Sequence, residues 1–183
     1  VELPPQVEQL PKLGFFPGST IGNMVASTAV DLLRSMRATL GEGAQLLIGM
    51  DQIKDPAVLV AAYDDAAGVT ARFNLNLVHR INRELDGDIP AGALRHEARW
   101  VDDAARIEMH LVATRDIAFS VSGRSFAMRA GESIHTENSH KFDLRSGNLL
   151  LLAGGWTPTQ RWLDPAGQFA LVLADATEPR SAP

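Results

Sequence analysis

The sequence predicts an α/β fold, because strand and helix patterns both occur in it, in three stretches. Residues 13–50 have the pattern of a strand, a helix and a second strand. The last of these, residues 44–50 (AQLLIGM), is continuously apolar, as expected for a strand covered on both faces. In residues 94–128 the apolar period changes to two, which is typical of antiparallel strands. Residues 144–174 then indicate a helix and a hairpin with a polar turn.

The first stretch is organised around a glycine-containing corner. Residues 13–16 indicate a short buried strand, residues 17–23 (PGSTIGN) break it, and a long helical repeat follows from Met24. In open α/β sheets, ligands bind beyond the carboxyl ends of the strands at such corners. Small polar side chains beside helix-start N–H groups suit a carboxylate or an amine. An ordinary capped loop has the same pattern, so this spacing alone is a weak sign of function.

The middle of the chain is expected to hold helices first and short strands afterwards. Asp55 and Pro56 predict the cap and first residue of a short helix that runs to about Asp64. Glycines and prolines separate the remaining elements. These elements are a helix at 69–85, strands at 94–101, 106–114, 117–120 and 125–128, a helix at 144–153, and strands at 156–163 and 168–174.

Composition narrows the classes of function. The 183 residues are 45% apolar and 21% charged, which suits an ordinary globular chain with a real core. A net charge of -5 without a basic run argues against nucleic acid as a partner. No apolar run approaches the roughly 18 residues that span a bilayer, so no membrane partner is predicted. The absence of cysteine excludes thiolate metal sites and fits a cytoplasmic protein.

The polar stretch 131–142 contains the densest group of hydrogen-bonding side chains. If it is extended, Glu137 and Ser139 face the same side of the chain. A carboxylate beside a hydroxyl suits a ring that offers one N–H and one bare nitrogen, such as imidazole. A solvated loop with a helix cap explains the same residues equally well, so both interpretations stay open on this pattern.

Other polar residues have simpler structural explanations. His135, His140 and Glu137 could be metal ligands, but their spacing matches no known pattern, and we predict no metal site. Tyr63 is more often a half-buried packing residue than a ligand group, and Met109 is most simply core. No arrangement of a nucleophile with a base can be assigned, so we name no catalytic residue.

Several ordered motifs together resemble one family. The sequence from about Leu13 to Asp175 is similar to the histidine-specific N-methyltransferases of ergothioneine biosynthesis, which use S-adenosylmethionine. The motifs that carry this similarity are FPGSTIGN (16–23), AYDD (62–65), GVTARFNLN (68–76), RINREL (80–85), IEMHL (107–111) and IHTENSHKF (134–142).

The resemblance implies a fold and a division of the chain. We expect the C-terminal half of a class I (Rossmann-like) methyltransferase sheet, in which a mostly parallel sheet is closed by an antiparallel hairpin. Residues 1–52 are expected to form part of this core, and residues 142–183 to return to it. Residues 53–141 are expected to form an inserted α+β substrate-recognition domain.

The resemblance also implies a set of substrate-binding residues. By similarity, Gly18 and Asn23 contact the amino and carboxylate groups of histidine, and Tyr63 helps to hold the carboxylate. Thr70 and Met109 line the pocket, and Glu137 and Ser139 bind the imidazole. The chain departs from the family in two respects. The N-terminal half with the main cofactor loop is absent, so the cofactor-binding residues are unknown, and His140 stands where relatives often carry tyrosine.

We therefore expect S-adenosylmethionine-dependent methylation of the α-amino group of L-histidine to its trimethyl betaine. This chain is expected to supply substrate recognition and to be inactive alone. One alternative is a non-catalytic amino-acid-binding or interaction module derived from the family. Another is a methyltransferase for a different amino acid. An open edge at the strand 13–16 predicts self-association.

Overall fold

The computed structural model describes residues 3–7 and 9–176, and their contacts divide the chain into two compact units. Unit 1 comprises residues 1–53 and 139–183, and unit 2 comprises residues 54–138. Each unit is described by itself. The assignment of residues 53–141 to a substrate-recognition domain stays a prediction.

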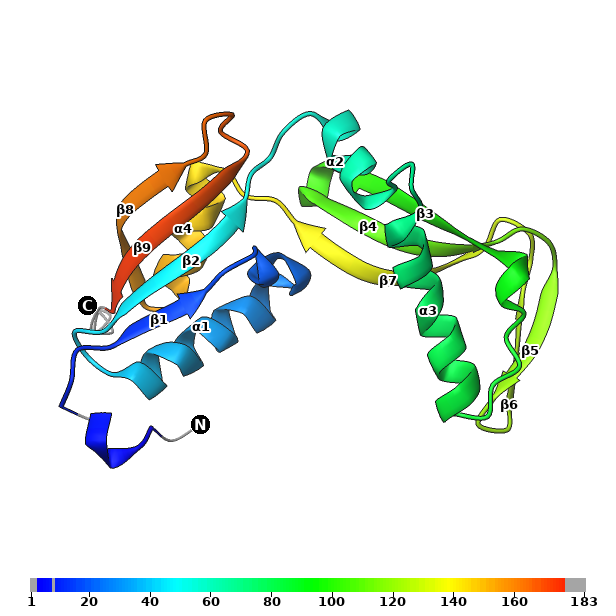
Figure 1. The fold of residues 1–183 in the computed structure, drawn as a ribbon, viewed down its shortest axis with the longest axis horizontal. Helices are drawn as coiled ribbons and strands as arrows, with labels where there is room; N and C mark the ends of the chain where they lie inside the picture. Colours follow the sequence, from blue (N-terminus) through cyan, green and yellow to red (C-terminus); the bar gives the residue numbers. More distant parts are fainter. Residues whose placement is uncertain (1–2, 8, 177–183) are drawn as a thin grey trace. The chain divides into compact units, whose positions relative to one another are not determined.

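Unit 1 is built on a four-stranded sheet in the order β1-β2-β9-β8 (Figure 1). β1 (Leu13–Phe16) is parallel to β2 (Gln45–Asp51), whereas β9 (Phe169–Ala176) is antiparallel to both β2 and β8 (Trp156–Leu163). The predicted α/β class and the closing hairpin are confirmed. The expectation of a mostly parallel sheet is also confirmed for the four described strands, because β1, β2 and β8 run in the same direction and only β9 runs against them.

Two helices cover this sheet, α1 (Ala26–Leu40) and α4 (Leu144–Ala153). Leu33 of α1 and Leu151 of α4 belong to the same buried cluster as Trp156 and the inward-facing residues of β2. The indole Nε1 of Trp156 donates to the carbonyl oxygen of Leu33 at 2.9 Å, so the largest side chain of this core buries no unsatisfied donor.

The corner before α1 differs from the sequence prediction. Gly18 and Ser19 both adopt positive φ angles, 73° and 55°, and the 3₁₀ turn η2 (Thr20–Asn23) follows. Met24 is extended, so the helix begins at Ala26 rather than at Met24.

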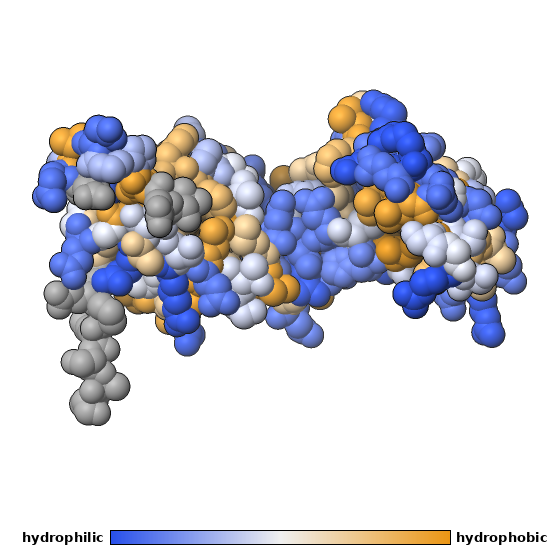
Figure 2. All heavy atoms as spheres, turned by 90° about the horizontal axis from the view of Figure 1, so that it is seen from below, coloured by the Kyte–Doolittle hydropathy of each residue, from blue (hydrophilic) through white to orange (hydrophobic). Residues whose placement is uncertain are grey.

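The first strand is less buried than expected. Leu13 and Phe15 are 58% and 65% exposed, so the prediction of a buried strand is wrong for the outward-facing half of β1. Alternate residues of a strand face opposite sides, and only Gly14 and Phe16 are partly covered. On the face of the molecule drawn in Figure 2, apolar side chains reach the surface as orange areas among hydrophilic ones.

Unit 2 packs two helices on a three-stranded antiparallel sheet in the order β3-β4-β7. Val78 of α3 packs with Leu94 and Leu111 in one buried cluster, and Leu59 of α2 packs with Ala98 and Ile107 in another. The elements are α2 (Pro56–Tyr63), α3 (Val69–Glu84), β3 (Leu94–Val101), β4 (Arg106–Ala113), β7 (Ser133–His140) and the hairpin β5 (Ile117–Val121) with β6 (Arg124–Met128).

Short 3₁₀ turns complete the chain, at η1 (Pro5–Val7), η3 (Ala91–Ala93) and η4 (Asp102–Ala104). Asp55 caps α2 by accepting the N–H of Ala57 at 2.8 Å, as predicted. The polar stretch 131–142 is extended over β7 and is not a solvated loop. Among the described residues, no helix is long and apolar enough to cross a membrane.

The packing of the corner generates a stability prediction. A Cβ on Gly22 would lie 2.6 Å from the carbonyl oxygen of His140, which is backbone and cannot yield easily. We expect Gly22→Ala to lower the free energy of unfolding by about 1–3 kcal/mol, as overpacked sites do. Gly92→Ala is the matched control, because no atom lies within 4 Å of its added Cβ. Chemical denaturation with equal midpoints for both variants would contradict this packing.

Candidate functional site

The structure places the predicted substrate-binding residues in both units. In unit 1 these are Gly18, Asn23 and Ser139, and in unit 2 they are Tyr63, Thr70, Met109 and Glu137. The two sets are considered separately.

The glycine corner uses its own hydroxyl groups to hold its shape. Ser19 Oγ accepts the backbone N–H of Asp51 at 2.9 Å, and Thr20 Oγ1 donates to the carbonyl of Pro17 at 3.3 Å. Gly49 of β2 lets the corner approach, since a Cβ there would lie 3.1 Å from the backbone nitrogen of Gly18. Asn23 is exposed at the end of η2. The corner therefore offers the Asn23 amide and backbone groups to a ligand, rather than the two hydroxyls.

Ser139 belongs to a buried polar group that the sequence did not reveal. The ammonium of Lys141 donates to Ser139 Oγ at 2.9 Å and pairs with the carboxylate of Asp51 at 2.7 Å. The Lys141 side chain is 0% exposed, and an unpaired ammonium at that depth would be very costly. In the sequence, the one sign of this group is Asp51, an aspartate directly after the apolar run 44–50. Its position does not show that Lys141 is its partner.

The residue that departs from the family pattern has a structural role in this unit. His140 Nδ1 lies 2.9 Å from the backbone carbonyl oxygen of Gly22. The ring nitrogen donates this bond, because a carbonyl oxygen can only accept. His140 thus ties the end of β7 to the glycine corner.

Glu137 of unit 2 lies at a pocket of about 200 Å³. Ligand pockets commonly measure about 300–1,000 Å³, so this one suits a ring or another small group rather than a whole cofactor. Burial raises the pKa of the Glu137 carboxyl above its ordinary value. The lining residues are Phe73, Asn74, Asn76, Leu77, Arg80, Thr136 and Glu137.

Tyr63 does not line this pocket, but a buried hydrogen-bond chain fixes its backbone. Asn74 Nδ2 lies 2.9 Å from His96 Nδ1, and His96 Nε2 lies 2.7 Å from the carbonyl oxygen of Tyr63. An amide nitrogen can only donate a hydrogen bond, and a carbonyl oxygen can only accept one. Asn74 therefore donates to His96 Nδ1, and His96 Nε2 donates to the carbonyl of Tyr63. The ring of Tyr63 packs beside the cluster of Leu59, Ala98 and Ile107. The end of α2 is therefore held to α3 and β3.

Thr70 and Met109 are also held by local contacts. The carboxylate of Asp65 accepts the backbone N–H groups of Thr70 at 2.8 Å and of Val69 at 3.0 Å. These bonds, with that of Thr70 the strongest, lower the pKa of Asp65 to about 2. Met109 is 4% exposed in β4, and its carbonyl accepts from Thr136 Oγ1 at 2.9 Å. Of the predicted residues in unit 2, only Glu137 lines the pocket.

Comparison with known proteins gives consistent matches. A family model described as histidine-specific methyltransferase, SAM-dependent, matches residues 1–176. Histidine N-alpha-methyltransferases from Mycolicibacterium smegmatis and Mycobacterium tuberculosis are 42% and 41% identical over 165 residues, which cover 89% of this chain and 51% of each relative. The chain thus spans about half the length of these curated relatives.

Two further matches have lower sequence identity. Ergothioneine biosynthesis protein 1 of Neurospora crassa is 30% identical over 149 residues, which cover 79% of this chain and 16% of that protein. Among solved structures, an S-adenosylmethionine-dependent methyltransferase from Clostridium acetobutylicum aligns with a TM-score of 0.47 at 10% identity. That alignment covers 92% of this chain and 60% of the other.

The buried ion pair generates the second prediction. Lys141→Met removes the ammonium and leaves the Asp51 carboxylate, which is 19% exposed, without this cation. We expect a loss of about 3 kcal/mol in the free energy of unfolding, as for other broken buried pairs. Arg83→Met is the matched control, because the Arg83–Glu84 pair is exposed and worth at most about 1 kcal/mol. Equal urea midpoints for the two variants would show that the Lys141 pair contributes little.

Proposed function

Because the chain belongs to the family of histidine-specific, S-adenosylmethionine-dependent methyltransferases, we propose that the complete protein methylates the α-amino group of L-histidine. The product is the trimethyl betaine of histidine, an intermediate of ergothioneine biosynthesis. The names of the relatives support this substrate and this pathway. This chain contributes recognition of histidine, and its expected cytoplasmic location stays a prediction.

The observation that carries the proposal is the half-buried carboxylate of Glu137 at a pocket of ring size. Burial disfavours the charge of an isolated carboxylate, and an N–H donor from a ligand restores the lost stabilisation. An imidazole N–H is such a donor, and the adjoining ring of Phe73 offers an apolar contact. Glu137 therefore accepts the imidazole N–H of histidine.

Ser139 follows Glu137 by two residues on the same extended strand. Its oxygen already accepts a hydrogen bond from the Lys141 ammonium. A hydroxyl can donate to or accept from a ring nitrogen, so Ser139 is compatible with the second nitrogen of the imidazole.

The remaining recognition residues orient the amino acid. Gly18 and Asn23 contact the amino and carboxylate groups, and Tyr63 supports the carboxylate. Thr70 and Met109 lie outside the lining of the pocket at Glu137, so their contact with histidine stays a prediction from the resemblance. S-adenosylmethionine supplies an electrophilic sulfonium methyl group. Transfer to a neutral amine depends on positioning and on a deprotonated nitrogen, so no nucleophilic side chain of this chain is assigned a step.

We also propose that S-adenosylmethionine binding needs residues beyond those that the structure describes. The loop that follows β1, residues 17–19, uses its serine to bind the Asp51 backbone N–H. η2 has only four residues, which is too short for a helix-dipole site. We therefore expect titration calorimetry of the isolated chain to show no S-adenosylmethionine binding in the micromolar range. Micromolar affinity would overturn the view that the cofactor site needs further residues.

Substrate choice gives the direct test of Glu137, in a complete protein that includes the N-terminal half. A hydrogen bond to a charged group is worth about 1.5–3 kcal/mol, and an unpaired partner adds to the loss. Glu137→Ala should lower kcat/KM for histidine roughly ten- to several-hundred-fold. Ser139→Ala should cost less, on the order of 1 kcal/mol, because the lost bond is neutral.

The decisive measurement for these variants is the ratio of histidine use to leucine use. Glu42→Ala is the control, because this carboxylate is exposed between α1 and β2. Cofactor affinity should stay unchanged in all three variants. If Glu137→Ala keeps the wild-type ratio, Glu137 does not bind the imidazole.

We also propose that the isolated chain self-associates through β1. β1 is the first strand in the order of its sheet, and its exposed Leu13 and Phe15 favour pairing with a second copy. Analytical ultracentrifugation should show a concentration-dependent dimer, which Phe15→Lys weakens. Phe126→Lys, at an exposed position of β6 in unit 2, should leave it intact. A monomer at all concentrations would contradict the proposal.

A further inference from the structure

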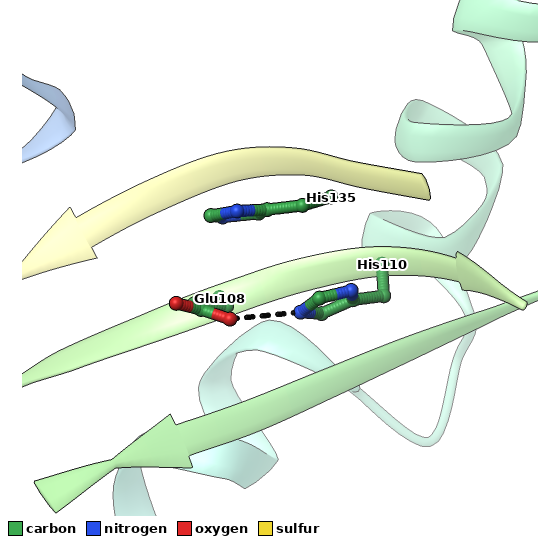
Figure 3. A group of neighbouring side chains, drawn as sticks. All are labelled: Glu108, His110 and His135. Atoms are coloured by element: carbon green, nitrogen blue, oxygen red, sulfur yellow. Dashed lines mark hydrogen bonds and ion pairs between the residues drawn. The ribbon is translucent and has the colours of Figure 1, made fainter. Parts of the chain in front are cut away.

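Three potential ligand side chains gather on one part of the antiparallel sheet of unit 2. Glu108 and His110 are two residues apart on β4 and project from the same face, and His135 comes from the neighbouring strand β7 (Figure 3). One nitrogen or oxygen atom of each residue lies within 4.8 Å of the corresponding atoms of the other two. His110 is buried, Glu108 is partly buried and His135 is exposed, so the group is reachable from solvent on one side.

Each of these side chains is oriented by a second partner. Arg106 Nε donates to Glu108 Oε1 at 2.9 Å, which leaves Oε2 directed at His110 Nε2, 3.0 Å away. His110 Nδ1 lies 3.1 Å from Ser133 Oγ, and His135 Nε2 lies 3.0 Å from the carbonyl oxygen of Glu137. Metal-binding histidines and carboxylates are commonly held by such outer partners, which fix the ring orientation and the tautomer.

These partners determine which nitrogens can bind an ion. A backbone carbonyl only accepts, so His135 carries its proton on Nε2, and Nδ1 is bare in the neutral ring. The Ser133 hydroxyl can donate or accept, so it serves His110 in either tautomer. His110 can therefore release its Nε2 proton and keep a hydrogen bond at Nδ1.

We propose that Glu108, His110 and His135 form a binding site for a divalent transition-metal ion of the zinc class. Two imidazoles and one carboxylate are a donor set that such ions bind, and three protein ligands leave a position for water. The ion replaces the proton between His110 Nε2 and Glu108 Oε2. This site is separate from the pocket at Glu137, whose lining includes none of the three side chains.

Metal binding requires one local rearrangement. The His110 and His135 rings are stacked, with centroids 5.0 Å apart and an interplanar angle of 17°. A metal ion lies in the plane of each imidazole ring that binds it. The planes of the His110 and His135 rings are nearly parallel, so no point close to both ring nitrogens lies in both planes. The exposed ring of His135 must therefore tilt toward His110 when the ion binds. Loss of this stacking is therefore the expected signature of binding.

This proposal revises the sequence expectation of no metal site. The group considered there was His135, His140 and Glu137. Within unit 1, His140 is bonded to the backbone of Gly22. His135 instead lies beside two residues of β4 that are more than twenty positions away in the sequence, which linear spacing could not reveal.

The test is a Zn²⁺ titration of the chelator-treated chain without a histidine tag. We expect one Zn²⁺ per wild-type chain, with affinity reduced about tenfold or more in His135→Ala and in Glu108→Gln, because each removes one ligand. His79→Ala is the matched control, since His79 is an exposed histidine of α3 outside the cluster, and its affinity should equal that of the wild type.

Co²⁺ absorption provides a second readout, for which only the exposed residue His135 needs to be substituted. The wild-type chain should give a visible Co²⁺ absorption band, and His135→Ala, altered at an exposed residue, should lose it while the circular dichroism spectrum stays unchanged. The proposal is overturned if the wild type binds neither ion, or if His135→Ala binds them as the wild type does.

Discussion

The buried ion pair between Lys141 and Asp51 is the constraint on which much of unit 1 depends. It joins the end of β2 to the segment that follows β7. Backbone bonds reinforce this junction, since Phe142 N donates to the Asp51 carbonyl at 2.9 Å and Ile53 N donates to the Phe142 carbonyl at 3.1 Å. The chain leaves unit 1 after Ile53 and returns to it at Ser139. The ion pair and the backbone bonds therefore hold the outgoing and the returning segment of the chain together within unit 1.

This junction also determines the chemistry offered by the end of β7. The Lys141 ammonium holds the Ser139 oxygen as an acceptor, and His140 is bonded to Gly22. A hydroxyl on a mobile loop could present either polarity to a ligand. Here the contact with Lys141 holds the hydroxyl in place, so a residue outside the predicted substrate contacts orients one of them.

Periodicity was sufficient to predict most elements, because repeats of two and of 3.6 residues follow directly from burial of one face. It correctly located α2, α3 and the strand pairs β3–β4, β5–β6 and β8–β9. It could not show that Leu13 and Phe15 are exposed, since the same apolar residues occur in buried and edge strands. Lys141, Asp51 and the cluster at Glu108 were missed for another reason. Their partners are distant in sequence, and pairing across a fold leaves no local pattern.

Two carboxylates of unit 2 show how the environment separates their chemistry. The hydrogen bond from Arg106, helped by His110, lowers the pKa of Glu108, so this group stays ionised and can attract a cation. Burial removes water from the Glu137 carboxylate and raises its pKa. A carboxylate already paired with arginine gains little from a neutral N–H donor, whereas a desolvated one gains more. The same sheet therefore presents one carboxylate suited to an ion and one suited to an imidazole N–H.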